Sequence, residues 1–251
     1  MSEKAVAQIK ALIEECSADE QLALLSHLRK RFPHALEKEW GIESDIIMTS
    51  IARSSDLTKR GMRGIIAEAV FSEKILGPLV SKGWNADEIL DDRPYDFLIK
   101  NGKAEVRIQV KLQRMEKGVP KVRKYGDTEM YVVEVQKTRT GKNSSTKEDT
   151  RPYRFGEFDI IAVSMHPSTK DWTKFYFTVG DWLLPRAHDE KLMEIMQPVA
   201  KAPNEVWTNS LEACIDWLLK GEKKKIFDSA ISRARARRPG KTKGRSRRRR
   251  H

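Results

Sequence analysis

The sequence predicts an α/β protein in which a mixed central sheet is flanked by helices, with a helical segment before it and a disordered basic tail after it. Three observations support this fold class. Apolar residues recur at helical spacing early in the chain, they alternate at a period of two around 95–112, and residues 233–251 include no hydrophobic residue larger than alanine. A chain of 251 residues with 39% hydrophobic content can form one main domain with appendages.

Residues 1–54 are predicted to form an N-terminal helical segment. Residues 3–16 and 18–31 have the apolar spacing of two amphipathic helices, and Ser17 opens a capping-box pattern in front of the second. A third helix is expected around 43–53.

The main domain is predicted over 55–190 and begins with a long helix at about 62–81, which ends near Lys82 and Gly83. The period then changes from helical to two, and Asn101-Gly102 separates two alternating runs as a hairpin turn does. With Asn101 and Gly102 as the two central turn residues, Lys100 pairs with Lys103.

In that register Asp96 lies opposite Arg107, and parity assigns the side chains of the hairpin to two faces. A core face is expected to hold Val106, Ile108, Val110 and Leu112. The other face is expected to be polar and to hold Asp96, Glu105, Arg107, Gln109 and Lys111. Asp96 and Gln109 become near-diagonal neighbours, with Cβ atoms roughly 5–8 Å apart.

The remaining elements are predicted from shorter patterns. Strands are expected at 130–136, 158–165 and 173–179, and an exposed loop at 138–150. Helices are expected at 188–197 and 210–220, so that residues 191–232 form C-terminal helices packed on the domain.

The formal net charge of +12 is concentrated at the C-terminus. Eleven Lys and Arg residues lie between Arg233 and Arg250 without an acidic residue, which leaves 12 − 11 = +1 for the rest. The tail at 233–251 is expected to be disordered and to bind polyanions. A localisation signal or a solubilising extension explains it equally well.

Other classes of protein are disfavoured by the composition. The two cysteines, Cys16 and Cys214, are isolated, and the five histidines form no zinc-ligand pattern, so a bound cation is expected to have oxygen ligands, with Mg²⁺ as the first choice. The chain has neither a run of about 18 apolar residues nor a signal peptide, which predicts a cytoplasmic protein without a membrane span.

Pro94-Tyr95-Asp96, followed after the hairpin by Gln109-Val110-Lys111, resembles the motif of the PD-(D/E)XK nuclease superfamily, in the variant with Gln before the Lys. The similarity covers roughly residues 60–115 and includes an upstream helix with Glu68. It implies a restriction-endonuclease-like fold, a divalent metal, and DNA cleavage that leaves a 5′-phosphate.

The resemblance also implies roles for single residues. Asp96, Gln109 and the backbone carbonyl of Val110 would bind the metal, Glu68 would complete the site, and Lys111 would assist the attacking water. The motif departs from the usual one in the inserted Tyr95 and in Gln109, whose oxygen is uncharged, so that firm binding of a cation would depend on Glu68. The simpler alternatives are an amphipathic hairpin with solvated polar residues and a solvated Glu68.

Two segments are candidates for binding nucleic acid, because Lys and Arg supply most contacts to phosphates. The first runs from Lys111 to Gly126, and a solvated loop is the alternative for it. The second runs from Lys137 to Arg154 and includes Tyr153. The basic residues of these segments are Arg114, Lys117, Lys121, Arg123, Lys124, Arg151 and Arg154.

The sequence therefore predicts a Mg²⁺-dependent endonuclease that acts on double-stranded DNA, in first place a sequence-specific restriction enzyme of type II-like character. A structure-directed repair or junction-cleaving nuclease is the alternative within the class. A non-catalytic nucleic-acid-binding protein that keeps the fold is the alternative outside it. Because enzymes of this superfamily that cut both strands are often dimeric, we expect a homodimer.

Overall fold

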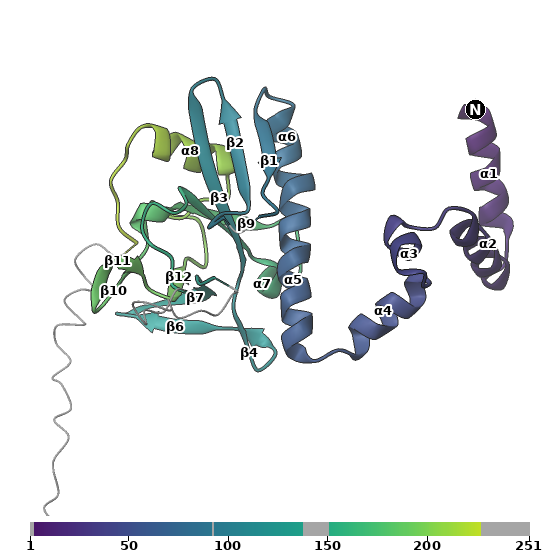
Figure 1. Cartoon of the computed structure of the whole chain (residues 1–251), viewed down its shortest axis with the longest axis horizontal. Coiled ribbons are helices and arrows are strands. Elements are labelled where there is room, and N and C mark those ends of the chain that lie inside the picture. The colour runs from purple at the N-terminus through teal and green to yellow at the C-terminus, as the bar shows by residue number, and fades with distance from the viewer. Residues whose placement is uncertain (1–2, 92, 138–150, 227–251) are drawn as a thin grey trace, which may run out of the picture. The chain divides into compact units, whose positions relative to one another are not determined.

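The computed structural model describes residues 3–91, 93–137 and 151–226 (Figure 1). The loop predicted at 138–150 and the basic tail predicted from residue 233 lie outside the described residues. The chain divides into two compact units, Met1–Gly61 and Met62–His251, which we call the N-terminal and C-terminal units. This boundary falls seven residues after the predicted one. No helix among the described residues is long and apolar enough to span a membrane.

The N-terminal unit is helical, as predicted. Its helices are α1 (Glu3–Glu15), α2 (Ala18–Arg31), α3 (Ala35–Trp40) and α4 (Ser44–Arg53), of which α3 was not predicted. The capping box before α2 is confirmed, because the Ser17 hydroxyl accepts from the Glu20 amide and the Glu20 carboxylate accepts from the Ser17 amide at 2.8 Å. Local sequence thus determines where α2 begins.

The predicted long helix is present, but it starts six residues earlier. Helix α5 (Asp56–Val70) continues without a break into the π-helical segment η1 (Phe71–Leu76) and then into α6 (Gly77–Val80). The wider π-helical turn carries Phe71, whose ring lies 5.2 Å from Phe97 and 5.4 Å from Phe175 on two strands of the sheet. These aromatic contacts anchor the helix to the sheet.

The central sheet has five strands: β1 (Asn85–Glu88), β2 (Phe97–Asn101), β3 (Ala104–Leu112), β8 (Ile160–Ser164) and β9 (Phe175–Val179). They lie in the order β1-β2-β3-β8-β9, and only β3 and β8 are parallel. The prediction of a mixed sheet flanked by helices is therefore confirmed at the level of an α/β fold.

The register of the β2–β3 hairpin differs from the predicted one by two residues. Asn101 pairs with Ala104, so the central turn residues are Gly102 and Lys103. Of these two only Gly102 has positive φ, at 58°, which is the pattern of a turn with Gly at its first central position. A shift of two preserves parity, so the assignment of residues to faces is unchanged while Asp96 moves from opposite Arg107 to opposite Gln109.

A second sheet contains β6 (Val122–Tyr125), β7 (Thr128–Glu134) and β12 (Met196–Val199) in the order β12-β7-β6. Two further hairpins are formed by β4 (Met115–Glu116) with β5 (Val119–Pro120) and by β10 (Pro185–Arg186) with β11 (Asp189–Met193). The strands predicted at 130–136, 158–165 and 173–179 are confirmed by β7, β8 and β9.

The helix predicted at 188–197 is wrong, because β11 and β12 occupy this stretch. Pairing of β12 with β7 supplies the backbone hydrogen bonds that a helix would have made, and Pro198 disfavours a helix there. Within the predicted C-terminal helices, 191–232, the structure describes one helix, α8 (Leu211–Leu219), which confirms the helix expected at 210–220.

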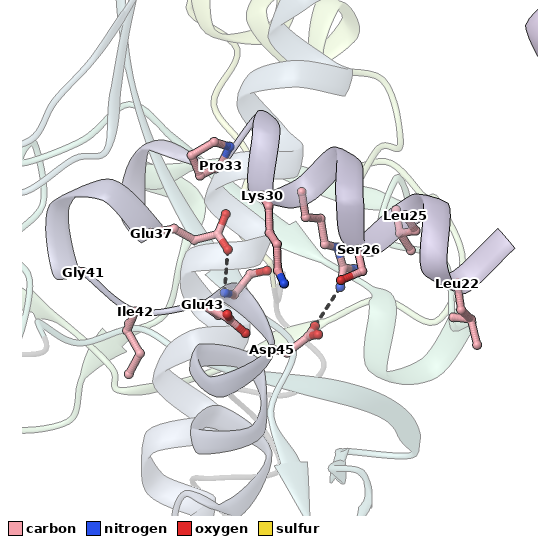
Figure 2. Close-up of a pocket in the computed structure, with 12 residues that line it drawn as sticks. Leu22, Leu25, Ser26, Lys30, Pro33, Glu37, Gly41, Ile42, Glu43 and Asp45 are labelled. Atoms are coloured by element: carbon pink, nitrogen blue, oxygen red, sulfur yellow. Dashed lines mark hydrogen bonds and ion pairs between the residues drawn. The ribbon is translucent and has the colours of Figure 1, made fainter. Parts of the chain in front are cut away.

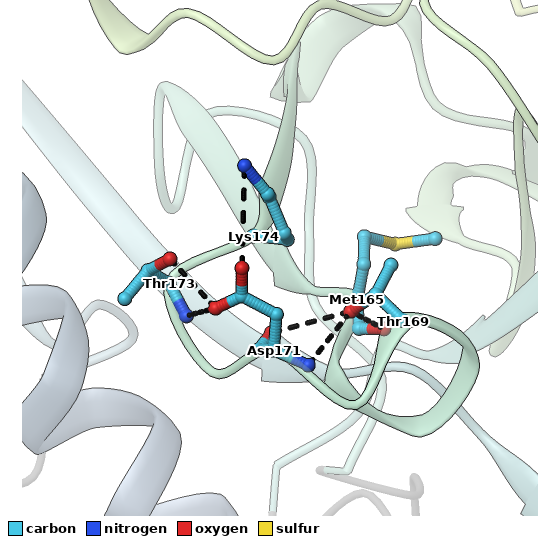
Figure 3. Close-up of polar contacts among 5 residues, drawn as sticks. All are labelled: Met165, Thr169, Asp171, Thr173 and Lys174. Carbon is cyan, nitrogen blue, oxygen red and sulfur yellow. Dashed lines mark hydrogen bonds and ion pairs between the residues drawn. The ribbon is translucent and has the colours of Figure 1, made fainter.

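The connection between β8 and β9 is fixed by local hydrogen bonds (Figure 3). It contains the short helix α7 (His166–Thr169). The Thr169 hydroxyl donates to the Met165 carbonyl at 2.9 Å, and one Asp171 carboxylate oxygen accepts from the Thr173 amide at 2.8 Å and from its hydroxyl at 2.7 Å. Side chains that satisfy backbone groups in this way hold a turn in one conformation, so the edge of the sheet beyond β8 is well defined.

Candidate active site

Asp96 stands directly before β2 and is held by β3. Its amide donates to the Ile108 carbonyl at 3.0 Å, and its side-chain Oδ2 accepts from the Val110 amide at 2.8 Å and from Gln109 Nε2 at 2.6 Å. Asp96 and Gln109 are therefore direct neighbours rather than the near-diagonal pair expected from the sequence.

The Asp96 carboxyl is largely shielded from water, and this burial raises its pKa above the ordinary value. The nearby Lys111 charge and the two hydrogen bonds from β3 act in the opposite direction. Because Oδ2 takes both of these bonds, Oδ1 has no hydrogen-bond partner among the described residues. One carboxylate oxygen is thus available to a ligand.

Gln109 is 2% exposed, which excludes for this residue the simpler alternative of a hairpin with solvated polar residues. Its amide nitrogen points to Asp96, and its Oε1 accepts from the Tyr153 hydroxyl at 3.2 Å. A carboxylate only accepts hydrogen bonds, so without a cation the amide must present nitrogen to Asp96. The Tyr153 hydroxyl can donate or accept, so it is compatible with either orientation of this amide.

Glu68 projects from α5 and makes no hydrogen bond or ion pair among the described residues. Burial raises its pKa to about 7, and the Asp96 carboxylate and Glu88 add to this shift while Lys111 opposes it. Two carboxyls that raise a pKa in this way lie close together. The structure therefore brings Glu68 to Asp96, although 28 residues separate them in the sequence.

Lys111 lies among these groups. Its charge lowers the pKa of Glu68, of Asp96 and of Tyr153, and its Nζ lies 5.7 Å from the centre of the Tyr153 ring. The Lys111 ammonium group thus acts on both carboxyls and lies near the Tyr153 ring, which the Lys137 ammonium group also approaches, at 5.4 Å. Gln109 contacts Asp96 and Tyr153 directly, and Glu68 is near enough for the charges of Asp96 and Lys111 to act on its pKa.

Tyr153 is the residue that sequence analysis missed. It was placed on an exposed recognition segment, but it is 4% exposed and packs edge-on against Phe158 at 5.3 Å. The Lys137 amide donates to the Arg151 carbonyl at 2.8 Å, and this backbone pairing places Tyr153 beside Gln109. No local pattern indicates this contact, because Tyr153 is 44 residues from Gln109.

The donor atoms at this place suit a hard divalent cation. Glu68, Asp96 Oδ1 and the Val110 carbonyl provide oxygens, and the Gln109 amide provides another when it presents Oε1. Across the described ranges no group of three His, Cys, Asp or Glu side chains forms a metal-binding cluster. A cation at this site would therefore need the amide or the backbone oxygen in addition to the two carboxylates.

The predicted nucleic-acid-binding residues are in different environments. Arg114 forms an ion pair with Glu134, and Lys121 pairs with Glu116 at 2.6 Å. Lys117 is exposed in the β4–β5 turn, and Arg154 is also exposed, whereas Arg151 is half-buried. Arg123 and Lys124 are exposed on β6, the edge strand of the second sheet.

Arg107, which shares the polar face of β3 with Gln109, pairs with a residue at the start of β8. It forms a two-pronged ion pair with Asp159, with nitrogen–oxygen distances of 2.9 and 2.7 Å. The same Asp159 carboxylate accepts from the Arg107 amide at 2.8 Å. This pair joins β3 to the start of β8 and so belongs to the scaffold of the site.

No protein-family model and no curated protein sequence matches the chain. Among solved structures, the chain is similar to the bacterial homing endonuclease I-Ssp6803I, with 21% sequence identity and a TM-score of 0.37, over 64% of this chain and 94% of the other. We base the functional proposal below on the residues of the site.

Replacement of Glu68 by Gln is expected to stabilise the metal-free protein at pH 8. The folded-state pKa of about 7 exceeds the unfolded value of 4.5, so the wild type loses stability as pH rises from about 4.5 to 7. The variant avoids this loss and should gain about 1–2 kcal/mol at pH 8, a figure reduced for solvent screening. Urea unfolding at pH 8 and pH 4 measures the difference, which should vanish at pH 4; equal stability at pH 8 would contradict the burial of Glu68 beside Asp96.

Tyr153→Phe is expected to lower the free energy of unfolding by about 1–2 kcal/mol, because the buried Gln109 Oε1 loses its hydrogen bond while the ring contacts remain. Tyr176→Phe is the matched control, since Tyr176 is half-buried on β9 and its hydroxyl makes no hydrogen bond to the described residues. The control should change stability by less than about 0.5 kcal/mol. Equal effects of the two substitutions in chemical denaturation would remove the role given to the Tyr153 hydroxyl.

Proposed function

We propose that the chain is a Mg²⁺-dependent endonuclease that hydrolyses DNA phosphodiesters. The observation that carries this proposal is the pairing of the buried Asp96 carboxyl with Gln109 beside Lys111, where Asp96 Oδ1 and the Glu68 carboxyl have no hydrogen-bond or ion-pair partner among the described residues. Burial of two neighbouring carboxyls with one ammonium group is unfavourable in a metal-free fold, and a bound divalent cation would reverse the sign of this interaction.

In this proposal Glu68, Asp96 and the Val110 carbonyl hold the cation, and Gln109 joins them by presenting Oε1. The cation supplies Lewis-acid polarisation of the phosphoryl group and lowers the pKa of a water. The Val110 amide fixes the direction of the Asp96 carboxylate, and Tyr153 keeps the Gln109 amide in place in either orientation. Lys111 orients the attacking water and counters the negative charge of the transition state.

The exposed edge of the second sheet is the proposed DNA-binding surface. Gln113, just after β3, forms a bridge with Val133 on β7, so this sheet continues from the end of β3 that carries Lys111. β6, at its edge, presents Arg123 and Lys124 to solvent. Basic side chains on the β6–β7 hairpin, at the edge of this sheet, can follow a DNA groove and contact its phosphates.

Within this class we propose a sequence-specific restriction endonuclease acting on double-stranded DNA. The segment after β3 is long, and its β4–β5 and β6–β7 hairpins are the kind of loops and strands that carry recognition on a rigid scaffold. This finer assignment has the further support of the motif resemblance. Discrete cleavage fragments are its distinguishing property.

Asp96→Asn and Lys111→Ala are each expected to reduce Mg²⁺-dependent cleavage by roughly a thousandfold or more, because each removes a group that acts on the reacting phosphate or its metal. Asn keeps an acceptor for the Val110 amide, so the fold is preserved. The assay is digestion of several unmethylated phage and plasmid DNAs with and without Mg²⁺. Lys103→Ala, at the other end of β3, is the control and should cleave as the wild type does.

The same digestion separates the proposed activities. Discrete bands from the wild type support restriction-type cleavage. Smears, or a preference for branched DNA, would indicate a structure-directed nuclease instead. If the wild type cleaved none of the DNAs tested, the protein would be a non-catalytic DNA-binding protein. Unchanged cleavage by both substituted proteins would refute the site.

Replacement of both Arg123 and Lys124 by Ala is expected to weaken DNA binding and to reduce the slope of log affinity against log salt by up to about 2, since each phosphate contact contributes about 0.9. Lys100→Ala with Lys103→Ala removes the same charge from the hairpin end remote from Lys111 and should leave the slope near the wild-type value. Fluorescence anisotropy over a salt series measures both. An equal effect of the two double substitutions would show that only net charge matters.

A further inference from the structure

The N-terminal unit exposes an unusual amount of apolar surface. No residue of α1, α2, α3 or α4 is buried, and no described residue before Ala67 is buried. Yet twelve of the nineteen exposed large hydrophobic residues of the described chain lie in this unit. They are Val6, Ile9, Leu12, Leu22, Leu25, Leu28, Phe32, Trp40, Ile42, Ile46, Met48 and Leu57.

These side chains follow helical spacing, so they form continuous stripes. On α1 the stripe runs through Val6, Ile9 and Leu12, and on α2 it runs through Leu22, Leu25 and Leu28 towards Phe32, which is 71% exposed. An amphipathic helix folds stably when its apolar face is covered, and clustered exposed apolar residues mark an interaction surface. A unit of 61 residues is also small for an independent core.

Several polar contacts join the helices within the unit. Arg29 on α2 pairs with Asp45 on α4 at 2.8 Å, and the Glu37 carboxylate of α3 accepts from the Ser44 amide at 2.7 Å. Between these helices lies an open cavity of about 360 Å³, whose apolar lining includes Leu22, Leu25 and Ile42 (Figure 2). Ion pairs and caps thus connect these helices, Leu24, Leu36, Ile47 and Ile51 are half-buried, and the twelve exposed apolar side chains remain available.

The net charge of the N-terminal unit indicates which kind of partner can bind this surface. Residues 1–61 contain nine basic and ten acidic residues, a net charge of −1, whereas the rest of the chain carries 12 − (−1) = +13. A nearly neutral, apolar surface with both signs of charge is suited to a protein rather than to a polyanion. It can also meet an identical surface without net repulsion, as a two-fold symmetric interface requires.

We propose that the N-terminal unit is a dimerisation element, whose exposed apolar stripes are buried against the same unit of a second chain. The oligomeric state tests this without reference to DNA cleavage. Sedimentation velocity of the full chain should give a species of twice 28.9 kDa. Replacement of Leu25 and Phe32 by Glu should shift it to the monomer, because two charges would have to be buried in the interface.

Leu90→Glu with Leu219→Glu is the matched control, since both leucines are exposed but lie in the C-terminal unit, at 90% and 54% exposure. This variant should remain dimeric. Far-UV circular dichroism shows whether each variant keeps its helices. A monomeric wild type over the whole concentration range, or a dimer that resists the Leu25 and Phe32 substitutions, would overturn the proposal.

A second measurement needs no substitution. Cys16 is partly exposed in the N-terminal unit, whereas Cys214 is buried and its thiol pKa is raised, so a nitroxide reagent should label Cys16 alone. Pulsed dipolar spectroscopy should give an intermolecular Cys16–Cys16 distance that disappears when labelled protein is diluted with unlabelled protein. Two compact 61-residue units in contact keep such labels within roughly 50 Å. Absence of the dipolar signal would mean that the stripes are covered by the same chain or by another protein.

The dimer has a consequence that rests on the proposed function. Each chain carries one site, and a dimer has one site for each strand of a duplex. In that case the Leu25 and Phe32 variant should nick supercoiled plasmid and fail to linearise it. A dimer without cleavage would disprove the proposed function alone, and nicking and linearisation by a monomeric wild type would disprove the dimer alone.

Discussion

The register between β2 and β3 is the constraint on which the candidate site depends. Because Asn101 pairs with Ala104, Asp96 comes to lie opposite Gln109, and the Val110 amide can bind the Asp96 carboxylate. A slip of one residue would move Asp96 to the other face of the sheet. The parallel pairing of β3 with β8, tied by the Arg107–Asp159 ion pair, then holds β3 in the middle of the sheet.

The site combines burial with unfavourable charge. Asp96 and Glu68 are shielded from water, the Asp96 carboxyl adds to the rise in the pKa of Glu68, and the Lys111 charge lowers the pKa of both. The fold tolerates this because the opposite face of the sheet is closed by the packing of Phe71 against Phe97, Phe175 and Phe177. Stability is thus supplied away from the site, while the site keeps an arrangement that favours a cation.

The two units differ in the chemistry of their surfaces. The C-terminal unit has a continuous apolar core and carries the positive charge of the chain, most of it at 233–250, whereas the N-terminal unit is nearly neutral and has no buried residue among those described. The surfaces proposed to bind DNA and a second chain therefore belong to different units. A chain organised in this way can change its partner surface without disturbing the sheet that positions Asp96 and Lys111.

Local pattern identified most helices, the main strands and the shared face of Asp96, Gln109 and Lys111, because alternate residues of a strand share a face whatever the exact turn. The motif resemblance added Glu68. The tertiary structure decided what covers each face. Gln109 is buried because Tyr153 arrives from 44 residues away, and β12 is a strand because β7 offers it hydrogen bonds. The periodicity of a segment predicts which of its side chains share a face. Which face is buried, and which strand pairs with which, depends on contacts with segments distant in the sequence, and these contacts form only when the whole chain packs.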